Sequence, residues 1–316
     1  MIKITFLGTS AGIPSFNRNH PSIAIEYFGK DYKLFLFDCG EGTQLQLMKA
    51  KISFMKINSI FITHWHADHF AGLISLIQTM NIEGRKEDLK IFAPNAKKYI
   101  EHILSLYEYK PFFKISAIDV ELSKEPIKVY EDEEIEIHAI EIKHSVKSVA
   151  YSFKEKDKYS IDEKKLEELN LKRGKWLDII KKQGYYKFKD GKEIKLEDIA
   201  YLKRGIKITY SGDCIYDENL VKLAKNSKVL IHEATYLEKD KEQEKLHSSA
   251  LDAAKIAKLA ECELLVLTHI SRRYQEKEDI EKFIEEAKTV FPNVIVAEDF
   301  LTIEITKDKM NFYKRL

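Results

Sequence analysis

The most constraining feature of this 316-residue sequence is a short run of metal-ligand side chains at the end of an apolar segment. The run Thr63-His64-Trp65-His66-Ala67-Asp68-His69 holds three imidazoles and one carboxylate within six residues. It closes a strand-like segment over 59–63 and opens a helical pattern over 69–80. A tight turn between them can bring the four side chains together, and zinc accepts histidine nitrogen at about 2.0–2.1 Å and carboxylate oxygen at a similar distance. The run therefore predicts a metal site at a strand end.

The remaining chain alternates strand-like and helical patterns, which indicates a layered α/β fold. With 44% hydrophobic residues, the chain can bury one large core or two closely joined halves. Strands are expected over 3–8, 22–27, 34–38, 59–63, 90–93, within 134–153, from 206 onward, and over 229–232, 264–268 and 294–297. Helices are expected over 69–80, 96–106, 249–260 and 278–290.

Three further ligand candidates also stand at the ends of predicted strands. His144 follows the strand-like residues 134–143, Asp213 follows 206–212, and His269 follows 264–268. Two metal ions need about seven to eight protein contacts, and strand ends at one edge of a sheet can supply them. Taken singly, each residue also has a structural alternative, such as a turn-capping aspartate or a surface histidine.

A basic segment interrupts the alternation over residues 153–205. It contains sixteen Lys and Arg against eleven Asp and Glu, a net charge of +5, so the rest of the chain carries −4 of the overall +1. Its centre, 172–195, interleaves nine basic residues with Trp176, Tyr185, Tyr186 and Phe188. Basic and aromatic side chains together suit a nucleic-acid backbone and its bases. A solvated lysine-rich lobe with a small aromatic core of its own explains the pattern equally well.

The remaining composition points to a cytoplasmic protein that does not enter membranes. The N-terminus runs directly into a strand-like pattern without a signal peptide, and no apolar stretch approaches about 18 residues. Three scattered cysteines, Cys39, Cys214 and Cys262, are too few for a disulfide framework and form no zinc-binding pair. A reducing compartment fits this cysteine usage.

Together these motifs resemble the metallo-β-lactamase superfamily and, within it, the ribonuclease Z (tRNase Z) family. Residues 7–15 with Arg18-Asn19 are similar to the family's opening loop, and 37–44 to its glycine-rich turn into a helix. The resemblance implies a four-layer αβ/βα sandwich with its metal site at one edge between the two sheets. The whole chain, 1–316, is then one catalytic domain, and 153–205 is an arm inserted within it.

The resemblance also implies a role for each candidate residue. One zinc would take His64, His66 and His144, the other Asp68, His69 and His269, and Asp213 would bridge both. Asp68 would also accept a proton from the attacking water. Glu233 and His247 resemble the family's second acid–base pair, in which the carboxylate orients an imidazole that protonates the leaving 3′ oxygen. Arg273 matches the family's phosphate-clamping arginine, with Arg272 as a competing assignment.

The inserted segment occupies the position of the family's tRNA-gripping arm, between the histidine and the bridging aspartate. Its basic candidates for tRNA contact are Lys172, Arg173, Lys175, Lys181 and Lys182. The segment lacks the family's usual Gly-Pro pair, because Gly174 is followed by Lys175 and Trp176. The shape of this arm is therefore expected to differ from the common short-form pattern.

The implied function is a zinc-dependent endoribonuclease that removes the 3′ trailer of precursor tRNA. It would cut after the discriminator nucleotide and leave a tRNA 3′-hydroxyl and a trailer 5′-phosphate, acting as a homodimer. Two Zn²⁺ ions per chain are expected, although Mn²⁺ or another divalent ion suits the same ligands. One alternative is a superfamily hydrolase of a small phosphodiester or lactone, and a second is an inactive RNA-binding module. The complete set of seven ligand candidates argues against the second.

Overall fold

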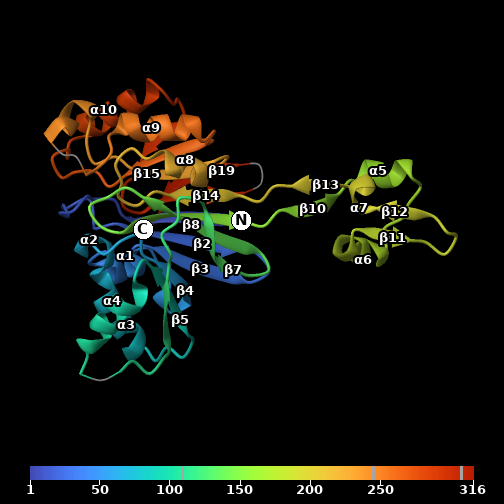
Figure 1. Cartoon of the computed structure of the whole chain (residues 1–316), viewed down its shortest axis with the longest axis horizontal. Coiled ribbons are helices and arrows are strands. Elements are labelled where there is room, and N and C mark those ends of the chain that lie inside the picture. Colours follow the sequence, from blue (N-terminus) through green and yellow to red (C-terminus); the bar gives the residue numbers. More distant parts are fainter. Residues whose placement is uncertain (109, 244–245, 307–308) are drawn as a thin grey trace.

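A computed structural model describes residues 1–108, 110–243, 246–306 and 309–316. Two sheets face each other in the body of the molecule, and helices cover the outer face of each (Figure 1). The first sheet consists, in spatial order, of β19 (Met310–Lys314), β18 (Leu301–Ile305), β1 (Ile2–Gly8), β2 (Ser22–Phe28), β3 (Tyr32–Phe37), β4 (Ile57–Phe61), β5 (Leu89–Ala93) and β6 (Ile115–Asp119). The second consists of β17 (Val294–Val296), β16 (Leu264–Thr268), β15 (Val229–Glu233), β14 (Lys207–Tyr210), β9 (Ser148–Glu155), β8 (Ile135–Ile142) and β7 (Ile127–Glu131).

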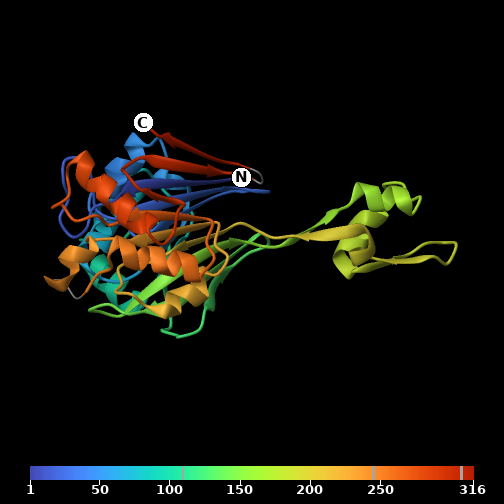
Figure 2. The same ribbon diagram turned by 90° about the horizontal axis from the view of Figure 1, so that it is seen from above.

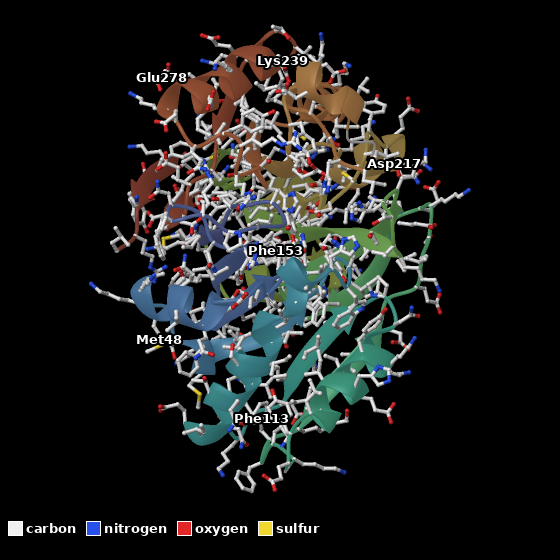
Figure 3. The ribbon with its side chains drawn as sticks, turned by 90° about the vertical axis from the view of Figure 1, so that its left-hand side faces the viewer. Met48, Phe113, Phe153, Asp217, Lys239 and Glu278 are labelled. Atoms are coloured by element: carbon white, nitrogen blue, oxygen red, sulfur yellow. The ribbon has the colours of Figure 1, made fainter. Side chains whose placement is uncertain are left out.

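Side chains alternate between the two faces of each strand, so both faces of each sheet carry apolar residues. These form three apolar interfaces, one between the sheets and one between each sheet and its helices. In β9, Tyr151 and Phe153 point into the core between the sheets, whereas Ala150 packs toward the outer helices. Figure 3 shows Phe153 near the middle of the body. The first sheet packs against α1 (Thr43–Lys49), α3 (Gly72–Ile82) and α4 (Ala96–Ser105), and the second against α8 (Glu218–Ala224), α9 (Ala250–Leu259) and α10 (Lys277–Lys288). The predicted αβ/βα sandwich is thus confirmed.

The predicted helix over 69–80 is wrong at its start. Helix α2 (Ala67–Phe70) begins within the ligand run, and α3 follows after a break at Ala71. The break brings Gly72 so close to the loop after β3 that a Cβ there would lie 2.0 Å from the carbonyl oxygen of Gly40. Asp68 and His69 consequently lie in the first turn of a four-residue helix rather than before a long one.

Residues 158–203 form a lobe that projects from one end of the body on two strands (Figures 1 and 2). We call this lobe the arm. It contains β10 (Lys158–Ile161), α5 (Glu163–Glu168), α6 (Trp176–Gln183), β11 (Tyr185–Lys187), β12 (Glu193–Lys195), α7 (Leu196–Ile199) and β13 (Ala200–Lys203). Strands β10 and β13 pair antiparallel, and a separate apolar cluster around Ile180 and Ile199 holds the lobe together.

Two short 3₁₀ helices, η1 (Phe54–Lys56) and η2 (Glu238–Gln243), complete the secondary structure of the described residues. None of the helices in the described ranges is long and apolar enough to cross a membrane.

Candidate metal centre

Strand direction brings the predicted ligands to one edge of the molecule. Strands β14, β15 and β16 are mutually parallel. Strand β8 runs in the same direction as they do, because β9 lies between β8 and β14 and pairs antiparallel with both. Their carboxyl ends lead to Asp213, Glu233, His269 and His144 at a single edge. Strand β4 of the first sheet ends just before His64. The seven ligand candidates therefore converge although they follow four separate strands, and Glu233 at the end of β15 lies beside them.

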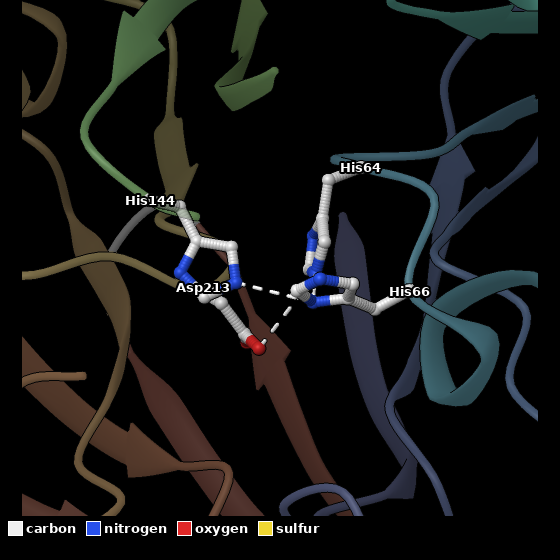
Figure 4. Close-up of side chains that lie close together, drawn as sticks. All are labelled: His64, His66, His144 and Asp213. Atoms are coloured by element: carbon white, nitrogen blue, oxygen red, sulfur yellow. Dashed lines mark hydrogen bonds and ion pairs between the residues drawn. The ribbon is translucent and has the colours of Figure 1, made fainter. Parts of the chain in front are cut away.

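The first cluster joins His64, His66, His144 and Asp213, whose side chains turn toward one another in Figure 4. His66 Nδ1 lies 3.0 Å from His64 Nε2 and 3.2 Å from His144 Nε2. Asp213 Oδ2 lies 3.8 Å from His64 Nε2. Ligand atoms arranged tetrahedrally around one zinc ion are about 3.3 Å apart. The spacing in this cluster is close to that value.

The second cluster joins Asp68, His69, Asp213 and His269. Asp213 uses its other oxygen here: Oδ1 lies 3.2 Å from Nε2 of both His69 and His269. Asp68 Oδ2 lies 3.5 Å from His69 Nε2 and 3.6 Å from His269 Nε2. One carboxylate thus faces both clusters, which is the geometry of a ligand shared by two ions.

Three atoms in the second cluster are buried without a hydrogen-bond partner among the described residues: His69 Nε2, Asp213 Oδ1 and His269 Nε2. An unpaired buried polar atom costs on the order of 1–3 kcal/mol, so native structures seldom leave several together. A divalent cation would satisfy all three at once. The donor set of imidazole nitrogens and carboxylate oxygens therefore fits a metal centre.

Neighbouring groups orient the histidines by holding their other ring nitrogen. The Thr235 hydroxyl donates to Glu233 Oε2 over 2.7 Å and lies 2.9 Å from His269 Nδ1, so it accepts a hydrogen bond from that ring. Thr63 lies in the same way 3.0 Å from His64 Nδ1, and the Leu246 carbonyl oxygen lies 3.1 Å from His144 Nδ1. A protonated Nδ1 leaves the Nε2 lone pair free for a metal ion.

Asp38 does the same for His69, with Oδ2 at 2.7 Å from His69 Nδ1. This carboxylate also accepts hydrogen bonds from Thr63 and from the Tyr210 hydroxyl. Sequence reasoning noticed the motif containing Asp38 but gave the residue no role. Its place at the end of the predicted strand over 34–38 is the signal that could have marked it, and in the structure it follows β3 with a positive φ of 55°.

The opening loop contacts the second cluster through its backbone. The Gly12 amide donates a hydrogen bond to Asp68 Oδ2 over 3.1 Å, and Gly12 has a φ of +50° that suits glycine. This contact, which the sequence did not predict, fixes one oxygen of the proposed proton acceptor.

The buried Glu233 and the partly buried His247 form an acid–base pair beside the clusters. Glu233 Oε1 lies 2.9 Å from His247 Nδ1, and it also accepts a hydrogen bond from the Cys214 amide. Burial lowers the pKa of His247, but the Glu233 carboxylate outweighs burial and raises that pKa to about 9. Burial raises the pKa of Glu233, and the facing His247 reverses this and lowers it. The pair is therefore arranged as a carboxylate and a protonated imidazole.

A cavity of about 440 Å³ opens over this edge. Asp68, Asp213, His247, Arg272 and Arg273 all line it. The Arg273 guanidinium carbon lies 5.2 Å from the centre of the Tyr236 ring, a distance suited to a cation–π contact. Both arginines face the cavity, so the choice between them as the phosphate clamp stays open.

The arm residues are placed far from this cavity, on the projecting lobe (Figure 1). Trp176 is 9% exposed and packs with Tyr186 and Phe188 in the lobe's own core. Most of the interleaved aromatic residues therefore build the lobe rather than offer free stacking surfaces. Arg173 forms an ion pair with Glu163 within the arm. No contact in the structure bears on the tRNA-binding role of Lys172, Lys175, Lys181 and Lys182, which stays a prediction.

Comparison with known proteins identifies the family. The chain is 40% identical over 321 residues to a ribonuclease Z of Methanocaldococcus jannaschii, covering 98% of both chains. It is 38% identical to a ribonuclease Z of Archaeoglobus fulgidus, covering 98% of this chain and 99% of that one. The chain belongs to the ribonuclease Z family. A family model described as anti-Pycsar protein Apyc1 also matches residues 2–183, a match that ends inside the arm.

Solved structures agree with this assignment to ribonuclease Z. The short form of human tRNase Z superposes with a TM-score of 0.67 at 27% identity, covering 96% of this chain and 99% of that one. The metallo-β-lactamase fold protein YhfI of Bacillus subtilis gives 0.66 at 20% identity, covering 95% and 98%. The predicted superfamily, fold and enzyme class are thereby confirmed.

Proposed function

We propose that this ribonuclease Z is a two-zinc endonuclease that removes the 3′ trailer from precursor tRNA. The observation that carries the proposal is the pair of ligand clusters sharing Asp213 at the floor of an arginine-lined cavity. Family membership adds support, because the similar human protein is a tRNase Z. The cut would follow the discriminator nucleotide and leave a tRNA 3′-hydroxyl and a trailer 5′-phosphate.

The two ions would be held by the residues of the two clusters, which are His64, His66, His144, Asp68, His69, His269 and Asp213. Two divalent ions at such a site polarise a phosphoryl oxygen and lower the pKa of a water, so hydrolysis can run at neutral pH. Zinc suits the histidine-rich donor set, although manganese also accepts these ligands.

The chain's own acid–base groups would then move the protons. Asp68, fixed by the Gly12 amide, accepts a proton from the attacking water, whose oxygen becomes part of the trailer's 5′-phosphate. His247, protonated and held by Glu233, donates a proton to the 3′ oxygen that leaves with the tRNA. Arg272 or Arg273 would hold a non-bridging phosphate oxygen.

The arm would grip tRNA away from the cleavage site, and the homodimer would let one subunit's arm present tRNA to the other's cavity. The length of the arm supports this division, since the lobe that carries these basic residues projects well beyond the body (Figure 2). Cytoplasmic location belongs to the same proposal. Light scattering of the purified protein measures the oligomeric state, and a monomer would contradict the dimer.

The decisive experiment incubates purified protein with a precursor tRNA carrying a 3′ trailer, with and without a chelator, and maps the cut. Chelator-sensitive cleavage after the discriminator nucleotide is expected, together with about two zinc ions per chain by elemental analysis. A protein that holds two metals and hydrolyses bis(p-nitrophenyl) phosphate but leaves precursor tRNA intact would point to a small-molecule hydrolase. Absence of bound metal would contradict the enzyme mechanism.

A further inference from the structure

A second cavity, of about 550 Å³, lies where the arm joins the body. We call it the root pocket. It is on the outer face of the second sheet, at the end of β14 opposite to the metal clusters: Lys207 begins β14 in the pocket, and Asp213 follows its other end. At about 3.3 Å per residue, some 20 Å of extended chain separates the two. The root pocket therefore cannot hold the phosphate that is cut at the metal centre of the same chain.

The pocket is strongly basic. Five cationic side chains line it against two carboxylates, and both carboxylates already have partners. Glu136 Oε1 accepts a hydrogen bond from Lys154 Nζ over 2.9 Å, and Asp157 Oδ1 accepts one from the Gly205 amide over 2.9 Å. Lys222 pairs with Glu125, so Lys207, Arg204 and Lys225 are the pocket cations without a carboxylate within ion-pair distance among the described residues.

Lys207 shows the imbalance most clearly. Its ammonium donates to the Lys225 carbonyl oxygen over 3.0 Å and has no carboxylate within ion-pair distance among the described residues. Burial, helped by the nearby charge of Lys154, lowers the pKa of Lys207 to about 8. A partly buried ammonium without a carboxylate partner gains from an anion placed next to it.

Two neutral hydrogen-bond donors, Ser152 and His138, also line the pocket. The Ser152 hydroxyl is buried without a hydrogen-bond partner in the described structure, although Ser152 lines the pocket. His138 is the cross-strand neighbour of Ser152, and burial lowers the pKa of its ring, which favours a neutral imidazole with one N–H to donate. Arg204, which connects β13 of the arm to the body, completes the rim.

We propose that the root pocket binds a phosphate group, held by Lys207, Arg204 and Ser152. A phosphate suits this donor set because its several oxygens can accept from a guanidinium, an ammonium and a hydroxyl together. The group could come from an RNA backbone that runs from the arm onto the body, or from free inorganic phosphate. The RNA form rests on the proposed function, whereas the free-anion form does not.

The test compares a root variant, Lys207→Met with Arg204→Gln, with a control, Lys86→Gln with Lys90→Gln. The control removes the same charge from exposed positions on the side of the first sheet. Fluorescence anisotropy measures the affinity for precursor tRNA over a range of salt concentrations, and calorimetry measures the binding of inorganic phosphate. Hydrolysis of bis(p-nitrophenyl) phosphate should be equal in all three proteins, since neither variant touches the metal centre.

For the RNA source, the root variant should bind precursor tRNA about 10-fold more weakly than the control does. The slope of log affinity against log salt should also become shallower by about one. For the free-anion source, tRNA affinity should match the control while calorimetric phosphate binding falls. Equal behaviour of root variant and control in both measurements would overturn the proposal.

A second, more conservative variant tests the pocket even if the double substitution impairs folding. Ser152→Ala removes only the unpaired hydroxyl and should weaken whichever ligand binds by about two- to threefold. A wild-type protein that fails to bind precursor tRNA would contradict the proposed function alone, because the calorimetric comparison would still decide whether the pocket takes phosphate.

Discussion

The Asp38 carboxylate lies 2.7 Å from Nδ1 of His69, and both side chains are fully buried. This contact turns His69 Nε2 toward Asp68 and Asp213, the other members of the second ligand cluster. Asp38 itself accepts hydrogen bonds from the Thr63 amide and the Tyr210 hydroxyl. The orientation of His69 therefore depends on three strands, because Asp38 follows β3, Thr63 follows β4 and Tyr210 belongs to β14.

Asp38→Asn should therefore weaken the second metal site without unfolding the protein. The amide keeps the size of the carboxylate but loses the charge that favours the Nδ1–H form of His69. Loss of such an outer contact typically lowers metal affinity or activity about 10- to 100-fold. Elemental analysis after dialysis should show one ion retained more firmly than the other. Asp119→Asn, at an exposed position, is the control, and equal metal content in the two variants would contradict the role given to Asp38.

His66→Ala and Asp68→Ala should each abolish cleavage while leaving precursor tRNA affinity largely intact. His66 belongs to the first ligand cluster and Asp68 to the second, so each change disables one half of the centre. A loss of about 10³-fold or more in turnover is expected. Cleavage assays and anisotropy on the same preparations check this, and a parallel loss of tRNA affinity would mean that the site also carries most of the binding.

His247→Ala should slow the chemical step about 10²- to 10⁴-fold with metal content unchanged. The Nδ1 atom of His247 lies 2.9 Å from Glu233 Oε1 and farther, at 3.9 Å, from Oδ2 of the shared ligand candidate Asp213. Glu233→Gln should show the same pattern in a weaker form, because it removes the charge that keeps His247 protonated. Single-turnover kinetics and elemental analysis separate the two effects. Loss of zinc from the His247 variant would make that residue a ligand instead.

The sequence alone predicted the layered fold and the group of residues at the metal edge, because both follow from local patterns. The strand over 264–268 has the predicted bounds, and its end carries His269. Strands β6 and β7 were not predicted, since their half-buried, mixed side chains give no clear alternation. The break between α2 and α3 depends on the contact of Gly72 with Gly40, which only the tertiary structure shows.

The groups that orient the ligands could not be predicted for the same reason. Asp38 and His69 are 31 residues apart, and Thr235 and His269 are 34 apart, so no spacing rule joins them. In the arm, local composition alone could not tell whether aromatic residues such as Trp176 bind bases or fill a core. Burial decides that question, and burial is a property of the folded lobe.

Asp299 should make the stability of the protein depend on pH. Burial raises the pKa of this carboxyl to about 6, although Asn19, Thr9 and Arg18 oppose the shift. Because its folded-state pKa exceeds the unfolded value of about 3.9, its contribution is fully present below pH 4 and is lost as pH rises through 6. The free energy of unfolding of the wild-type protein should fall between pH 4 and pH 7, and Asp299→Asn should make this fall smaller by roughly 2 kcal/mol. Urea titrations check this, with Glu298→Gln at the exposed neighbouring position as the control for removal of a carboxylate.

Removal of the arm should separate tRNA binding from hydrolysis. Lys158 and Lys203 are paired at the base of the arm, so a short glycine–serine linker can join Lys156 to Gly205 without disturbing β9 or β14. The arm has its own apolar cluster and shares none of the three clusters of the body, so the truncated body should still fold. Precursor tRNA affinity should fall by about 10-fold or more, whereas hydrolysis of bis(p-nitrophenyl) phosphate should stay within about twofold of wild type.

A charge-reversal variant keeps the arm in place and tests the same division. Lys181→Glu with Lys182→Glu changes the end of α6, whose partner residues for the lobe core are Trp176, Leu177 and Ile180. It should weaken tRNA binding most at low salt, because the electrostatic part of the affinity is screened as salt rises. If both the truncation and the charge reversal reduced hydrolysis of the small phosphodiester as much as tRNA binding, the arm would have to support the metal centre itself, and the separation of grip from chemistry would be wrong.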